Sequence, residues 1–93
     1  MEIGLLTINI HLPDAQSLKE KREVVRRLKD RLRARFNVSV AEVGDLDLWQ
    51  RSQVAVVSVN IDRVYLEQAF SSIERETEKI LAGNEFELHR EFL

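Results

Sequence analysis

The side chains best suited to bind a ligand are the nine basic residues crowded into positions 17–35. Only three acids lie among them, so the segment has a net charge of +6, whereas the rest of the chain carries five bases and thirteen acids. Ten of the fourteen bases are arginines, whose planar guanidinium groups suit bidentate contacts with phosphate or carboxylate. The overall charge of −2 therefore hides one strongly cationic segment.

Residues 17–35 are predicted to form a helix with its bases on one side. Ser17 and Glu20 form a capping box, and apolar residues recur from there to Phe36 at helical spacing. At 100° per residue, an arc without acids borders the apolar face and contains Lys19, Arg22, Arg26, Lys29 and Arg33. This stripe either binds an anionic partner such as RNA or is a solvated face with Lys19–Glu23 and Arg26–Asp30 pairs.

Lys21 falls inside the apolar arc of the same helix. Either its stem passes the edge of the core to reach water, or its ammonium points at an acid or phosphate near the helix start. The free backbone N–H groups at a helix N-terminus also favour anions. Lys21 and Arg22 together are therefore the strongest individual candidates for a ligand site.

Trp49 and Arg51 are candidate interaction residues in a connection between two predicted strands. A tryptophan in such a position stacks on a base or anchors an interface, or it covers the core or contacts a second copy. The sequence leaves these alternatives open.

Other reactive groups show no pattern that predicts catalysis. His11 and His89 lack metal-ligand spacing, and Glu42, Asp45 and Asp47 lack an EF-hand pattern and are interpreted as solvated acids. Phosphate-binding glycine loops and nucleophile elbows are absent from the sequence. We therefore expect no enzyme activity, no metal and no cofactor.

The elements that position these residues follow the order strand, helix, strand, strand, helix, strand. The predicted ranges are 3–12, 17–35, 38–43, 52–61, a helix that Asp62 caps and Gly83 ends, and a strand around 86–92. This α+β order predicts one ferredoxin-like βαββαβ domain over residues 1–93, with both helices on one face of a four-stranded antiparallel sheet.

The second face of that sheet is expected to be partly apolar and uncovered. If Leu6 and Val57 point toward the helices, then Leu5, Val54 and Val56 point away from them. Such a face either carries scattered valines or joins copies of the chain in a homo-oligomer.

The composition limits the remaining possibilities. The 93 residues contain no cysteine and no apolar run long enough to cross a membrane, so we expect a cytoplasmic protein without membrane contact. The high charge content, 32%, also fits a heat-adapted protein.

Three segments give the chain a family resemblance: Ser17–Arg22, Phe36–Val43 and Asp47–Arg51. Together they resemble the YlxP-like family of small bacterial proteins, and the resemblance covers nearly the whole chain. It implies a ferredoxin-like fold. Because genes of this family often lie near those for translation initiation and ribosome maturation factors, it also implies a link to ribosomes or RNA.

Two functional hypotheses follow. The first is a non-catalytic RNA- or ribosome-associated factor that uses the basic face of the first helix. The second is an oligomeric protein-interaction module with no nucleic-acid role.

Overall fold

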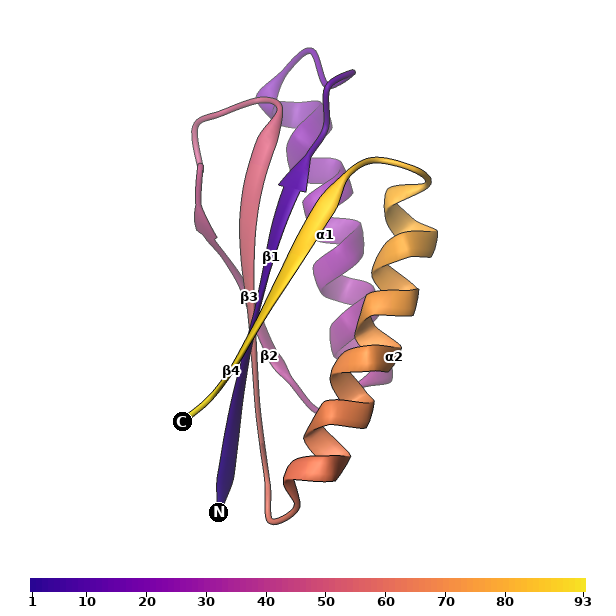
Figure 1. The fold of residues 1–93 in the computed structure, drawn as a ribbon. Coiled ribbons are helices and arrows are strands. Elements are labelled where there is room, and N and C mark those ends of the chain that lie inside the picture. The colour runs from indigo at the N-terminus through magenta and orange to yellow at the C-terminus, as the bar shows by residue number, and fades with distance from the viewer.

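A computed structural model describes residues 1–93, and its six elements follow the predicted order (Figure 1). The bounds are β1 Glu2–His11, α1 Leu18–Arg35, β2 Ser39–Gly44, β3 Arg51–Asn60, α2 Arg63–Leu81 and β4 Phe86–Phe92. These bounds lie within a few residues of those expected from the sequence. The predicted α+β, ferredoxin-like βαββαβ fold is confirmed.

Both helices begin at side-chain caps that the sequence indicates. The Ser17 hydroxyl accepts a hydrogen bond from the backbone N–H of Glu20 at 3.1 Å, while the Glu20 carboxylate accepts from the Gln16 N–H at 2.8 Å. The Asp62 carboxylate accepts from the Val64 N–H at 2.9 Å. Each cap satisfies N–H groups that a helix start otherwise leaves unpaired. Neither helix is long and apolar enough to span a membrane.

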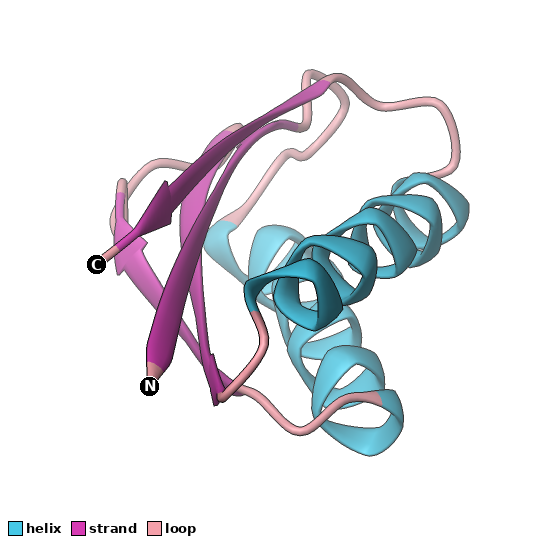
Figure 2. Ribbon diagram, turned by 60° about the horizontal axis from the view of Figure 1, so that its bottom comes forward, coloured by secondary structure: helices cyan, strands magenta, loops and turns pink.

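The four strands form one antiparallel sheet in the order β2-β3-β1-β4, and both helices cover the same face of it (Figure 2). Alternate residues of the two central strands point into the space between sheet and helices. Leu6 and Ile8 of β1 lie opposite Val56 and Val54 of β3, and all four are fully buried. They pack against apolar residues of α1 and α2: Val25, Leu28, Leu32, Phe70 and Ile73.

The predicted orientation of β3 is wrong. Val54 and Val56 face the helices, whereas Val57 and Val59 point to the uncovered face. Residues directly opposite each other in an antiparallel pair share a face, so the register with β1 sets this orientation. Valines occur on both faces of β3, and the strand's own alternation could not decide between the two phases.

The uncovered face nevertheless carries an apolar strip, as expected. Val57 lies opposite Leu5, and Val59 lies opposite Ile3, so four apolar side chains from the two central strands share this face. The side chains of Val57 and Val59 are 40% and 58% exposed.

One close approach between sheet and helix depends on a glycine. A Cβ atom at Gly4 would lie 2.8 Å from the ring of the buried Phe70. We expect Gly4→Ala to lower the free energy of unfolding by about 1–3 kcal/mol, the usual cost of overpacking a core. Chemical denaturation measures this change.

Gly44→Ala is the matched control. Its added Cβ would lie 2.5 Å from Oε1 and 3.0 Å from Cβ of the half-exposed Gln53 side chain, whose amide end can move aside, so we expect a smaller loss of stability. Equal losses of stability in the two variants would show that the contact with Phe70 does not constrain the fold.

Candidate functional site

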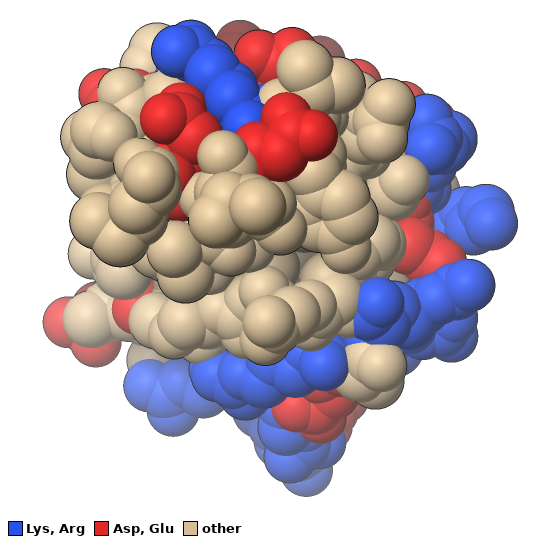
Figure 3. Space-filling view, turned by 90° about the horizontal axis from the view of Figure 1, so that it is seen from below, with Lys and Arg blue, Asp and Glu red and all other residues tan.

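Four of the predicted basic residues line one shallow groove along α1. Lys19, Arg22, Arg26 and Lys29 surround a hollow of about 630 Å³, whose remaining lining residues are Glu23, Val25 and Glu42. We call this surface, defined by its four basic residues, the basic groove. Glu42 belongs to β2, so the groove follows the side of α1 that faces this edge strand. Figure 3, a view from the end of the molecule where α1 finishes, shows Lys and Arg side chains along the lower rim and the right-hand side, with some Asp and Glu side chains among them.

The basic residues of the groove have no acidic partner. No carboxylate oxygen lies within 4.0 Å of the side-chain nitrogens of Lys19, Arg22, Arg26 or Lys29. The alternative Lys19–Glu23 and Arg26–Asp30 pairs are therefore not formed. Four positive charges consequently remain available to an external anion.

Arg33 is turned toward the sheet. One of its Nη atoms donates to the backbone carbonyl of Val40 at 2.6 Å, and the other lies 3.9 Å from the Asp30 carboxylate. Arg33 therefore joins the end of α1 to the edge strand β2, and its charge is partly compensated.

The other arginines near the end of α1 bind to α2. Arg35 forms an ion pair with Glu76, and an Nη atom of Arg31 lies 4.0 Å from the same carboxylate, whose side chain is 8% exposed. Arg27 donates to the Ile80 carbonyl at 3.4 Å. The free positive charge of α1 is thus concentrated in its N-terminal and central turns.

Lys21 differs from every other candidate because its side chain is completely buried. Its ammonium donates to the carbonyl oxygens of Asp45 at 2.7 Å and of Leu46 and Arg51 at 3.2 Å each. It also lies 3.1 Å from a carboxylate oxygen of Glu42. With its three protons directed at protein oxygens, Lys21 does not join its neighbour Arg22 at the surface.

The partners of Lys21 connect three parts of the chain. The Glu42 oxygen that faces Lys21 also accepts a hydrogen bond from the Ser52 hydroxyl at 2.7 Å. Asp45 takes a left-handed backbone conformation with φ of 58°, which Asp tolerates better than most residues. Lys21 therefore fastens α1 to the end of β2, to the connection that follows it and to the start of β3.

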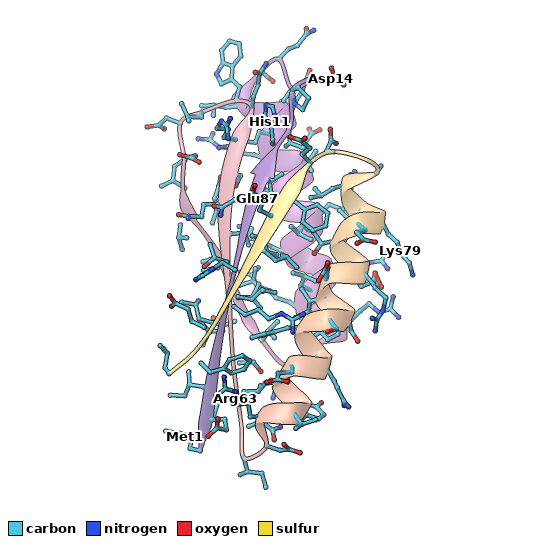
Figure 4. All side chains as sticks on the ribbon, in the orientation of Figure 1. Met1, His11, Asp14, Arg63, Lys79 and Glu87 are labelled. Carbon is cyan, nitrogen blue, oxygen red and sulfur yellow. The ribbon has the colours of Figure 1, made fainter.

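That connection, residues 45–50, exposes three large apolar side chains. Leu46, Leu48 and Trp49 are 52%, 49% and 53% exposed, so Trp49 does not serve as a buried cover for the core. The Gln50 amide donates to the carbonyls of Pro13 at 3.1 Å and Ala15 at 3.3 Å. Figure 4 labels Asp14 in this β1–α1 turn, at the upper end of the molecule, where the 45–50 connection also lies.

Arg51 starts β3 beside this connection. Its backbone carbonyl faces Lys21, and it pairs in register with His11 of β1.

The two histidines lie beside single acids. Nδ1 of His11 is 3.7 Å from Oε2 of Glu85, and Nε2 of His89 is 3.7 Å from Oε1 of Glu91. No group of three or more His, Cys, Asp or Glu side chains is placed to hold a metal ion.

Glu42 is the residue of the site that sequence reasoning missed. It was interpreted as a solvated acid, yet it is half-buried and forms the ion pair with Lys21. The position of Lys21 inside an apolar arc left two alternatives open, an ammonium that reaches water or one that meets an acid, and the structure has the second. No local pattern indicates that Glu42 is this acid, because the two residues meet only through the tertiary fold.

Comparison with known proteins decides the family. A family model described as "Protein of unknown function (DUF503)" matches residues 3–89. The chain belongs to this family. It is 38% identical over 71 residues to Uncharacterized protein YlxP of Bacillus subtilis (strain 168), covering 76% of this chain and 77% of that protein. The YlxP-like resemblance of the three sequence segments is confirmed.

Solved structures with low sequence identity share the fold of this family member. A C-terminal segment of the alpha subunit of aIF2 from Pyrococcus abyssi superposes with a TM-score of 0.62 at 20% identity, over 97% of this chain and 51% of that one. The de novo designed protein LFR1 1, with a ferredoxin fold, gives 0.60 at 12% identity, over 99% and 84% of the two chains. At these identities the likeness concerns the fold alone.

The buried ammonium of Lys21 leads to a stability prediction. Lys21→Met keeps most of the stem but leaves the half-buried Glu42 carboxylate without its counter-charge and removes one hydrogen bond from each of three carbonyl groups. We expect the free energy of unfolding to fall by about 3 kcal/mol, as when one member of a buried ion pair is removed. Thermal and urea denaturation measure the loss.

Lys19→Met is the matched control, because Lys19 is exposed two residues away on the same helix. We expect a change within about 0.5 kcal/mol, which is typical of surface substitutions. If the two variants proved equally stable, the contacts of Lys21 would not contribute to the free energy of unfolding.

Proposed function

We propose that this protein is a non-catalytic RNA-binding factor associated with ribosomes, and that it binds through the basic groove. The observation that carries the proposal is the set of four cations without acidic partners along one side of α1. The implied link of the YlxP-like family to translation supports RNA as the anion.

The spacing of the groove residues suits a phosphate backbone. Lys19, Arg22, Arg26 and Lys29 follow one another at intervals of three or four residues, which keeps them on one side of a helix. From Lys19 to Lys29 the helix rises about 15 Å, long enough to follow several phosphates. Contacts of this kind position the protein on RNA without reading its sequence.

The sheet is a less suitable RNA surface than the helix. RNA-binding sheets of this topology stack bases on aromatic side chains of the two central strands. On the uncovered face of β1 and β3 this protein has Leu5, Thr7, Ala55 and Val57. The absence of aromatic rings at these positions favours binding through α1.

A measurement of salt dependence tests this function. With four cations on phosphates of single-stranded RNA, log Kd should vary with log salt concentration with a slope of about 3. Arg22→Gln/Arg26→Gln should halve that slope and weaken binding to RNA and to purified ribosomal subunits. Filter binding at several salt concentrations gives both quantities.

Arg75→Gln/Lys79→Gln on α2 removes the same charge from another face and is the control. We expect the control to keep the slope of the unchanged protein. If the control lost as much affinity as the groove variant, binding would depend on net charge and the assignment to the groove would be wrong.

A second candidate function rests on the apolar strip of the uncovered sheet face. Ile3, Leu5, Val57 and Val59 lie together there, and the two valines are 40% and 58% exposed. Exposed apolar patches on small domains mark interaction surfaces. We infer that two copies of the chain pair through this face as a homodimer, which is compatible with RNA binding on α1.

Sedimentation tests the dimer. Val57→Lys/Val59→Lys places two charges in the centre of the strip and should yield a monomer, because unpaired charges are costly to bury in an interface. Val64→Lys on α2, where the side chain is 57% exposed, should leave the dimer intact. A monomer for the unchanged protein at high concentration would eliminate this candidate.

A further inference from the structure

The 45–50 connection combines exposed apolar side chains with a firmly held backbone. Leu46, Leu48 and Trp49 are about half exposed. Such side chains are usually mobile on a surface loop, but the carbonyls of Asp45 and Leu46 are bound to the buried ammonium of Lys21. The Gln50 side chain fastens the other end to the β1–α1 turn. The connection is therefore presented as a preformed surface.

This surface is joined to the basic groove through shared residues. Glu42 lines the groove and forms the ion pair with Lys21. Lys21 in turn holds the connection, and Arg22, the next residue of α1, lines the groove. One network of buried contacts thus fixes the position of the connection relative to the cations.

The two surfaces have complementary chemistry. The groove offers four positive charges, whereas the connection offers apolar side chains next to the exposed acids Asp45 and Asp47. Those carboxylates disfavour phosphate at the connection, while an indole ring stacks on any base.

We propose that the ligand of the basic groove is single-stranded RNA, and that an unpaired base stacks on Trp49 while its flanking phosphates lie in the groove. This inference rests on the proposed function and specifies its substrate. A duplex keeps its bases stacked inside the helix, so it can engage the groove but not Trp49. Lys21 acts as a positioning residue that holds the stacking platform.

Fluorescence provides a direct test because Trp49 is the only tryptophan of the chain. A twelve-nucleotide oligouridine should quench its emission on binding, since stacking on a base changes the surroundings of the indole. A twelve-base-pair RNA duplex and inorganic polyphosphate should bind the groove without this quenching. Equal quenching by all three probes would contradict stacking.

Variants separate the contributions of the two surfaces. Trp49→Ala should weaken binding of oligouridine roughly ten-fold, in line with the measured value of a base–aromatic stack, and leave polyphosphate binding unchanged. Trp49→Phe should retain most of the affinity because a ring remains. Tyr65→Ala, which removes an aromatic side chain of similar exposure from α2, should change neither affinity.

The outcomes distinguish the inference from the proposed function. If Arg22→Gln/Arg26→Gln weakens oligouridine binding while Trp49→Ala has no effect, the groove binds RNA and the stacking role is wrong. If the unchanged protein binds neither oligouridine nor duplex, both proposals fail. A change of oligomeric state in Trp49→Ala, with unaltered RNA affinity, would assign the tryptophan to contact with a second copy.

Discussion

The burial of the Lys21 ammonium group holds together the end of the molecule that contains the start of α1 and the 45–50 connection. Lys21 enters the interior from the second turn of α1 and meets Glu42 of β2, the carbonyls of Asp45 and Leu46, and that of Arg51 at the start of β3. A charge without water must be surrounded by protein oxygens, because an unpaired one is too costly to bury. These partners come from separate segments, and they must assemble together for any of them to be satisfied.

This constraint also divides the basic residues of α1 by role. Lys21, Arg31, Arg33 and Arg35 are used within the fold, against Glu42, Glu76 and the backbone of β2. The four residues of the basic groove have no such use. A cationic helix segment thus contains both structural and free charges, and only the contacts of the folded chain tell them apart.

The sequence predicted the elements well because their signals are local. Ser17, Glu20 and Asp62 mark helix starts through contacts within a few residues, and the alternation of Leu6 and Ile8 sets the face of β1. The orientation of β3 was missed because its valines occupy both faces and its register with β1 decides. Helical spacing alone put Arg22 on the same side of α1 as Lys19 and Arg26, where the structure has it. The partner of Lys21, in contrast, lies twenty-one residues further along the chain, and helical spacing does not predict such a contact.

The contact between Arg33 and the Val40 carbonyl has a consequence for self-association. β2 is an outer strand of the sheet, and exposed edges invite strands of other chains to extend the hydrogen-bonded ladder. The guanidinium of Arg33 occupies one backbone acceptor of β2 that an added strand would otherwise compete for. The Val40 carbonyl, already engaged by Arg33, is therefore not free to pair with an added strand at the place where α1 ends.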